Sequence, residues 1–230
     1  MYLLHYANNL IDFFLPRFCL HCNIRLNSTE RVVCPECYAG IQLMPNERLE
    51  YEYSNKFADE KIINGVFSPF VFQPEGSLQT LLHELKYKSR FRIGNFLGKI
   101  LAEFGEHRIK KWNIDIIIPM PLHKIKKAER GYNQSEHIAK SVGRILTIPV
   151  QSNLVKRIRF TQSQTKLSIA ERKLNMSGAF KVKKPRAIEG KNILIIDDVI
   201  TTGASVIELG RELKREEAMN IYAASIAFTD

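Results

Sequence analysis

The sequence contains no long apolar run. No stretch of about 18 consecutive apolar residues occurs in the chain, which excludes an ordinary membrane-spanning helix. No basic residue precedes the first apolar residues, and Asn8, Asn9 and Asp12 interrupt them, so residues 1–18 lack the pattern of a signal peptide. Helical spacing of the apolar residues predicts an amphipathic helix there, packed on the protein's own next domain or on a partner or membrane surface. We therefore expect a cytoplasmic protein, and leave open a peripheral contact with the inner face of the membrane.

Cysteine is absent outside one short segment. Two Cys-x-x-Cys pairs lie eleven residues apart, and their members are Cys19, Cys22, Cys34 and Cys37. Two such pairs predict a structural zinc site with four thiolate ligands. Two disulfide bonds are the alternative, and they are disfavoured because nothing in the sequence indicates export. A module this short buries little core, so we expect the metal to supply much of its folding free energy. His21 lies inside the first pair, and we predict that it is not a ligand.

Acidic residues are scarce in the middle of the chain. Residues 81–186 hold 24 Lys and Arg against 7 Asp and Glu, whereas the whole chain has a formal charge of +10. An excess of this kind suits a polyanionic partner, such as a nucleic acid, a phosphorylated small molecule or an anionic lipid. An ordinary basic, solvated surface is the alternative. We expect no direct DNA contact through the cysteine segment, because residues 1–60 carry a net negative charge and four zinc-bound thiolates would add to it.

The order of predicted elements indicates an α/β fold. Strands and helices alternate after residue 64, which is typical of a parallel sheet with helices on both faces. We predict a helix and a zinc ribbon over residues 1–44, a polar linker over 45–64 and the α/β domain over 65–230. The expected strands are 65–72, 114–121, part of 148–158, 178–182, 192–197 and 221–229. The expected helices are 77–90, with Ser77 as its cap, then 93–107, 133–146, 167–175 and 204–218.

Paired carboxylates stand at the end of the most apolar predicted strand. The segment Ile-Leu-Ile-Ile-Asp-Asp-Val-Ile-Thr-Thr-Gly-Ala-Ser covers residues 193–205. Ligands of open parallel sheets bind at the carboxyl ends of the strands, and the N-terminus of the next helix attracts anions. Carboxylates for hydroxyl groups beside hydroxyl and amide donors for a phosphate suit a phosphorylated sugar. A helix capped by one Asp is the alternative, but a cap needs neither the second Asp nor the rest of the segment.

This segment resembles the phosphoribosyl-diphosphate (PRPP) signature of type I phosphoribosyltransferases. The resemblance implies that Asp197 and Asp198 bind the ribose 2′ and 3′ hydroxyls. It implies that the following turn binds the 5′-phosphate and that Mg²⁺ accompanies PRPP. The residues expected in that turn are Thr201, Thr202, Gly203, Ala204 and Ser205.

Three further segments resemble the ComF family of proteins linked to natural competence. They are residues 85–90, 116–139 and 159–180. The resemblance implies a zinc ribbon joined to a type I phosphoribosyltransferase-like domain, a role in DNA uptake, and partners such as a DNA-translocating helicase and other competence proteins. The loop expected to contact diphosphate contains His123, Lys124, Arg130 and Gly131. Arg130 comes first because a guanidinium grips phosphate oxygens in a bidentate way. The residues expected in a flexible lid over the site are Thr161, Gln164, Lys166, Arg172 and Asn175.

Three functions remain open on the sequence alone. The first is an active phosphoribosyltransferase of unknown acceptor, with Asp197, Asp198 and Arg130 as its catalytic residues. The second is a competence-associated protein that binds single-stranded DNA, and the third is a PRPP sensor without turnover. No nucleobase pocket can be recognised in the sequence, and a fold does not by itself establish an activity.

Overall fold

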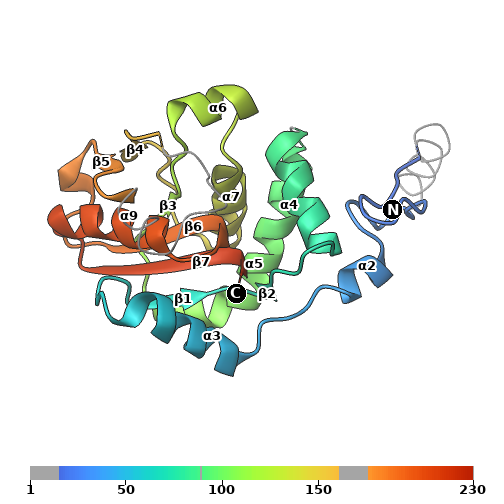
Figure 1. The fold of residues 1–230 in the computed structure, drawn as a ribbon, viewed down its shortest axis with the longest axis horizontal. Coiled ribbons are helices and arrows are strands. Elements are labelled where there is room, and N and C mark those ends of the chain that lie inside the picture. The colour runs from blue at the N-terminus through green and yellow to red at the C-terminus, as the bar shows by residue number, and fades with distance from the viewer. Residues whose placement is uncertain (1–15, 89, 161–175, 230) are drawn as a thin grey trace.

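A parallel sheet forms the centre of the molecule (Figure 1). The computed structural model describes residues 16–88, 90–160 and 176–229. The strands of this central sheet have the order β1-β7-β6-β3, with β2 also paired to β7, and every pairing within it is parallel. The strands are β1 Gly65–Phe67, β2 Phe70–Val71, β3 Ile116–Pro119, β6 Asn192–Ile200 and β7 Asn220–Phe228. The predicted fold class is therefore confirmed.

The apolar residues of β6 explain why this strand lies in the middle of the sheet. Leu194 and Ile196 pack into the core on one face, while Ile193 and Ile195 pack into the core on the other face. A strand buried on both faces has a nearly continuous apolar sequence, because successive side chains point to opposite faces. The strand continues through both aspartates to Ile200, three residues beyond the predicted end.

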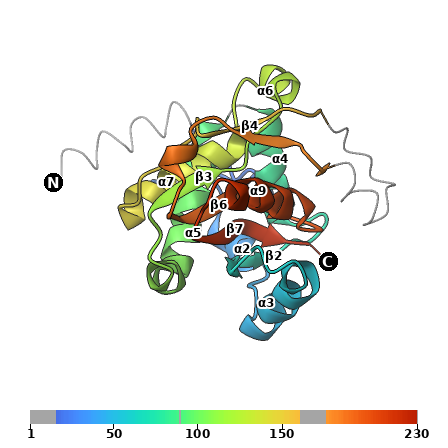
Figure 2. The ribbon, with the colours of Figure 1, turned by 90° about the vertical axis from the view of Figure 1, so that its left-hand side faces the viewer.

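Helices cover both faces of the sheet. The helices on one face are α4 Ser77–Tyr87, α5 Phe91–Lys111 and α7 Gln134–Leu146. The other face is covered by α9 Ala204–Arg215 and by residues of α3 Asn46–Tyr53. Figure 2 shows α6, the helix Lys124–Arg130, standing on the opposite side of the sheet from α3. In the part of the chain that the structure describes, no helix is long and apolar enough to cross a membrane.

A small second sheet lies beside the first. It pairs β4 Val155–Arg157 with β5 Phe180–Val182 in antiparallel fashion, and a 3₁₀ turn follows at Pro185–Ala187. Both strands match predicted segments. The helix predicted at 167–175 and the one predicted near the N-terminus lie outside the described residues.

Residues 45–64, for which the sequence predicts a polar linker, contain secondary structure and buried side chains. The helix α3 and a π-helix, Ser54–Ala58, occupy it. Leu49 and Phe57 are buried, and the hydroxyl of Tyr53 donates a hydrogen bond to the carbonyl of Ile63. These three residues recur every four positions among many charged residues, which obscures the apolar face in the sequence.

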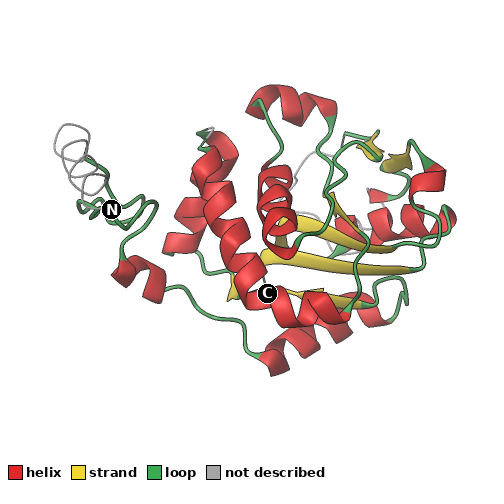
Figure 3. Cartoon of the chain, turned by 180° about the vertical axis from the view of Figure 1, so that it is seen from behind, coloured by secondary structure: helices red, strands yellow, loops and turns green. Residues whose placement is uncertain are grey.

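The cysteine segment lies beyond α4 and α5, at the end of the molecule away from α9 (Figures 1 and 3). It contains one short helix, α2 Pro35–Ala39. Gly76 rather than Ser77 is the N-cap of α4. The hydroxyl of Ser77 instead donates a 2.7 Å hydrogen bond to the carbonyl of Cys37. The residue predicted to cap the helix therefore attaches the cysteine segment to the α/β domain.

Candidate functional site

The paired carboxylates lie at the carboxyl edge of the central sheet and have different surroundings. Asp198 is buried, and its Oδ2 forms a 2.6 Å ion pair with Nζ of Lys86 on α4. Asp197 is half-buried, and its Oδ1 accepts hydrogen bonds from the hydroxyl of Ser135 at 3.0 Å and from the amide of Asp198 at 2.9 Å. Helices α4 and α7 thus hold one carboxylate each, and we call this group with Arg130 the acidic-pair site.

The pKa values of the two carboxyl groups shift in opposite directions. Burial raises the pKa of Asp197 to about 8, and the negative charge of Asp198 adds to the rise. Burial acts in the same direction on Asp198, but the Lys86 ammonium outweighs it and holds the pKa of Asp198 below its usual value. The same pairing raises the pKa of Lys86. Near neutral pH the pair therefore carries one firmly ionised carboxylate, at Asp198, and one that retains its proton readily.

The turn that follows β6 has the predicted position, and its glycine packs against a buried aromatic ring. Helix α9 begins at Ala204, and Gly203 is its N-cap with a φ of 73°. A Cβ at Gly203 would lie 2.8 Å from the ring of Phe57, so the position needs glycine for its left-handed backbone and for this contact. Gly203 therefore packs against the core while it remains part of the turn predicted to bind a phosphate.

The hydroxyl groups of the turn differ in exposure. Thr201 is exposed, Thr202 and Ser205 are half-buried, and Ala204 is buried. The hydroxyl of Ser205 donates to the sulfur of Met176 at 3.8 Å. The first amides of an α-helix have no partner within the helix, so the start of α9 offers donors for an anion beside the two threonine hydroxyls.

The segment after β3 is a short helix rather than the predicted loop. His123 caps α6: its Nδ1 accepts from the amide of Ile125, and its buried ring lies beside that of Phe160. Gly131 ends the helix with a φ of 77°. Of the four residues predicted to contact diphosphate, these two lie at the ends of α6, and Lys124 is an exposed residue in its first turn.

Arg130 is the predicted residue that the structure does bring to the site. Its guanidinium donates to Gln134 at 3.1 Å and lies 5.4 Å from the ring centre of Tyr87, the residue after Lys86. Burial lowers the pKa of Lys126, and the charges of Arg130, Arg157 and Lys86 lower it further. Three cations thus lie close enough to Lys126 to act on it, and one of them, Lys86, pairs with Asp198. Such a cluster suits a ligand with several negative charges.

Several residues of this site were missed from the sequence. Lys86, Lys126, Ser135 and Arg157 were not among the predicted site residues. Lys86 continues the row of buried Leu78 and Leu82 at a spacing of four, so a charged residue on the apolar face of α4 was the available signal. All five predicted lid residues, from Thr161 to Asn175, lie outside the described residues.

The acidic-pair site has the chemistry to hold a sugar phosphate. Asp197 Oδ1 is engaged by Ser135, which leaves Oδ2 as an acceptor for a hydroxyl or a ligand for Mg²⁺, a cation that prefers carboxylate oxygens. The turn 201–205, which leads into α9, comes four to eight residues after Asp197 in the chain. Magnesium would supply charge neutralisation for a bound diphosphate, and the cations around Lys86 would share that role.

The four cysteines form a second candidate site. Their sulfur atoms all lie within 4.8 Å of one another, and those of Cys22 and Cys34 are 3.7 Å apart. Four sulfurs bound to one zinc ion at 2.3 Å would be about 3.8 Å apart, so the cluster could bind zinc. His21 is not a member: its Nδ1 lies 3.0 Å from the hydroxyl of Thr80 on α4. Its ring therefore contacts α4.

Comparisons with known proteins agree with this geometry. The model of the phosphoribosyl transferase domain matches residues 132–229, which contain α7, β6, the acidic pair and α9. The fold and this match define a protein with a phosphoribosyltransferase domain. Competence protein F of Haemophilus influenzae is 28% identical over 224 residues, 90% of this chain and 94% of that protein.

Two other relatives are shorter or partial matches. DNA utilization protein YhgH of Escherichia coli K12 is 33% identical over 144 residues, 61% of this chain and 63% of that protein. An amidophosphoribosyltransferase of Haemophilus influenzae is 27% identical over 184 residues, 76% of this chain and 32% of that enzyme. The chain therefore spans just under two thirds of the YhgH proteins and about a third of the enzyme. In its four-cysteine cluster and its phosphoribosyltransferase domain, the chain is similar to the ComF/YhgH proteins.

Proposed function

We propose that the acidic-pair site binds PRPP in a cytoplasmic protein that acts on DNA taken up by the cell. The observation that carries the proposal is the arrangement around Asp197 and Asp198. One carboxylate is paired with Lys86, the other is half-exposed beside Ser135, and the anion-binding start of α9 follows directly.

The parts of PRPP have matching groups in this proposal. The ribose hydroxyls donate to the Asp197 and Asp198 carboxylates, and the 5′-phosphate lies against the turn 201–205. The diphosphate lies toward Arg130 and its neighbouring cations, with Mg²⁺ sharing its charge. Lys86 then has a further task, because it keeps Asp198 ionised while the polyanion binds nearby.

Calorimetric titration with Mg²⁺–PRPP tests this proposal. We expect binding by the intact protein and a loss of more than 100-fold in affinity for Asp198→Asn, which removes both an acceptor and the partner of Lys86. Asp59→Asn removes an exposed carboxylate elsewhere and serves as the matched control. Binding that survives Asp197→Asn and Asp198→Asn together, in a folded protein, would overturn the proposal.

Phosphoribosyl transfer is the second candidate activity, and the cation cluster favours it. In that reaction the bond from ribose C1 to the diphosphate breaks, a nitrogen acceptor forms the new bond and loses its proton, and diphosphate leaves. Cations beside the diphosphate stabilise this leaving group. Diphosphate release from Mg²⁺–PRPP in the presence of each nucleobase separates transfer from binding without turnover, the property of a PRPP sensor.

The relatives support the role in DNA use. One is named a competence protein and another a DNA utilization protein. We infer that single-stranded DNA and an uptake helicase or other competence protein are partners of this chain, and that peripheral contact with the inner membrane face brings it to them. Transformation frequency in a deletion strain complemented with the Asp198→Asn variant measures whether the PRPP site serves that role.

We also propose that the four cysteines bind one structural zinc ion. Four protein ligands leave no open position for catalysis, so the metal would hold the ribbon together. The backbone amides of Cys34 and Cys37 point to the sulfurs of Cys19 and Cys34 at 3.4 and 3.5 Å, as expected for thiolate acceptors. Elemental analysis should give one zinc per chain, and none for Cys34→Ser with Cys37→Ser.

A further inference from the structure

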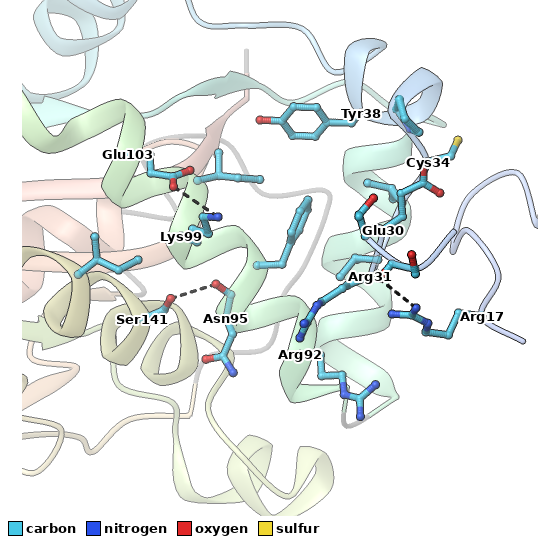
Figure 4. A pocket seen from close by; sticks show the side chains of 18 of the residues that line it. Arg17, Glu30, Arg31, Cys34, Tyr38, Arg92, Asn95, Lys99, Glu103 and Ser141 are labelled. Atoms are coloured by element: carbon cyan, nitrogen blue, oxygen red, sulfur yellow. Dashed lines mark hydrogen bonds and ion pairs between the residues drawn. The ribbon is translucent and has the colours of Figure 1, made fainter. Parts of the chain in front are cut away.

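A large cleft separates the zinc ribbon from helices α5 and α7. Its volume is about 1390 Å³, and none of its lining residues belongs to the acidic-pair site. Figure 4 shows the ribbon residues Arg17 and Arg31 on one wall and residues of α5, among them Arg92 and Lys99, on the other. Segments far apart in the sequence thus form one concave surface, and no function considered above uses it.

The cleft carries a net positive charge, and we call it the basic cleft. Five cations line it, namely Arg17, Arg31, Arg92, Lys99 and Arg144, against two carboxylates. Glu103 pairs with Lys99 at 3.5 Å, and Glu30 accepts hydrogen bonds from Asn27. Within the described residues, Arg31, Arg92 and Arg144 are exposed and have no ion-pair partner. Guanidinium groups left in this state are available for phosphate oxygens.

The cleft also contains aromatic surface. Tyr38 of the ribbon and Phe96 of α5 both line it, with their rings edge to face and the ring centres 6.2 Å apart. Both side chains are half-buried, so each presents part of its ring to the cleft. Single-stranded nucleic acids bind where a basic groove follows the backbone and aromatic rings stack on the bases. In a duplex the bases are already stacked on one another and would gain nothing from these rings.

From these observations we infer that the basic cleft is the binding site for single-stranded DNA. Phosphates contact Arg31 on the ribbon and Arg92 and Arg144 on the α/β domain, and unpaired bases lie against Phe96 and Tyr38. The inference rests on the proposed DNA role and assigns its location. It replaces the expectation that the ribbon makes no DNA contact, because the net charge of a segment does not determine which of its side chains face a cleft. A flat lipid surface does not reach the floor of a concave site, which favours a strand over a membrane.

Fluorescence anisotropy with a labelled 20-nucleotide oligo(dT) tests the assignment. The cleft variant is Arg92→Glu with Arg144→Glu, and the control is Lys181→Glu with Lys184→Glu, exposed residues outside the cleft that change the net charge equally. We expect the cleft variant to lose at least 20-fold in affinity and the control less than threefold. The slope of log affinity against log salt should fall by about 1.4 in the cleft variant, roughly 0.7 for each lost phosphate contact.

Controls separate the possible failures. Circular dichroism and retained PRPP binding establish that the cleft variant is folded. If the unchanged protein does not bind oligo(dT), the DNA role itself fails. If it binds but both double variants lose affinity equally, the DNA role stands and the location is wrong. Preferred binding of duplex DNA, polyglutamate or anionic vesicles by the same cleft residues would also overturn the assignment.

A second measurement needs no variant. Acetylation of the unchanged protein should be slowed at least fivefold at Lys99 by bound oligo(dT), while Lys184 reacts at the same rate with and without it. Lys99 is 62% exposed and therefore reactive in the free protein. Equal reaction rates at Lys99 with and without saturating oligo(dT) would place the DNA elsewhere.

Discussion

The acidic-pair site and the basic cleft both collect positive charge, but they hold it differently. Lys86 is largely buried and lies 2.6 Å from Asp198, whereas Lys99 is 62% exposed and lies 3.5 Å from an exposed Glu103. Opposite charges close together in a buried setting fix side chains in one geometry, and exposed cations remain mobile and screened by salt. The first arrangement suits one small ligand with a fixed shape. The second suits a flexible polyanion, such as single-stranded DNA, that can bind in any register.

Helix α7 connects the two regions. Ser135 in its first turn donates to Asp197, and Arg144 in its last turn lines the basic cleft. Nine residues of helix separate them, which is about 14 Å along the axis. The regions are therefore close, yet they share no lining residue, and their independence can be tested.

Removing the proposed zinc site should have the largest effect and should be confined to one region. The ribbon contributes few buried residues, so the loss of its metal should unfold it and remove one wall of the cleft. For Cys34→Ser with Cys37→Ser, we expect oligo(dT) affinity to fall at least 50-fold and Mg²⁺–PRPP affinity to change less than threefold. Anisotropy and calorimetry measure the two. An equal loss of both would show that the regions are not independent.

Removing the charge of Lys86 in the acidic-pair site should lower the free energy of unfolding. Lys86→Met leaves the buried Asp198 without its counter-ion, and an unpaired buried charge costs about 3 kcal/mol of the free energy of unfolding. Lys88→Met is the control, because Lys88 is 58% exposed, lies 3.9 Å from Glu84 and should contribute less than about 0.5 kcal/mol. Urea unfolding at pH 7 measures both. The double change of Lys86→Met with Asp198→Asn should recover most of the loss, and its failure to do so would assign the effect to packing.

The local features of the site could be predicted from the sequence. The apolar run at 193–196, the two aspartates and the start of α9 at Ala204 all follow from patterns within fifteen residues, which periodicity captures. The four cysteines are equally local. Each of these predictions depends on neighbours in the chain, and neighbours in the chain remain neighbours in the fold.

The partners of those residues could not be predicted in the same way. Ser135 and Asp197 are 62 positions apart, and their contact depends on how α7 crosses the end of β6. The cleft depends on the attachment of the ribbon to α4 through Ser77 and Cys37, which are 40 positions apart. The capping of α6 by His123 was not predicted either, because the sequence does not show where that helix begins. Tertiary packing determines such contacts, and it overrides local sequence preference.

Salt should weaken the binding of single-stranded DNA more than the binding of PRPP, by a smaller but measurable factor. A strand that contacts the three arginines of the cleft should lose about 20-fold in affinity between 50 and 200 mM salt, from a slope of roughly 0.7 per contact. PRPP, held by buried groups beside Lys86 and Asp198, should lose less than about fivefold, because buried pairs are screened less. Titrations of both ligands at four salt concentrations give the slopes. Equal slopes would remove the contrast between the regions.

The smallest expected effect concerns the proton on Asp197. Its pKa is about 8 in the folded protein and near 3.8 in the unfolded chain, so the folded state binds more protons between these values. The free energy of unfolding should therefore decrease as pH rises from about 4 to 8 and should level off above that. Asp197→Asn removes this group and keeps an acceptor for Ser135. The full shift corresponds to about 5–6 kcal/mol, but solvent screens this half-exposed carboxylate, so the free energy of unfolding should rise by about 1–2 kcal/mol at pH 8 and by almost nothing at pH 4. Thermal unfolding across this range measures the difference. A constant difference would mean that Asp197 is ionised throughout, and a gain in stability together with lost PRPP binding would show that this carboxylate is retained for its ligand at a cost to the fold.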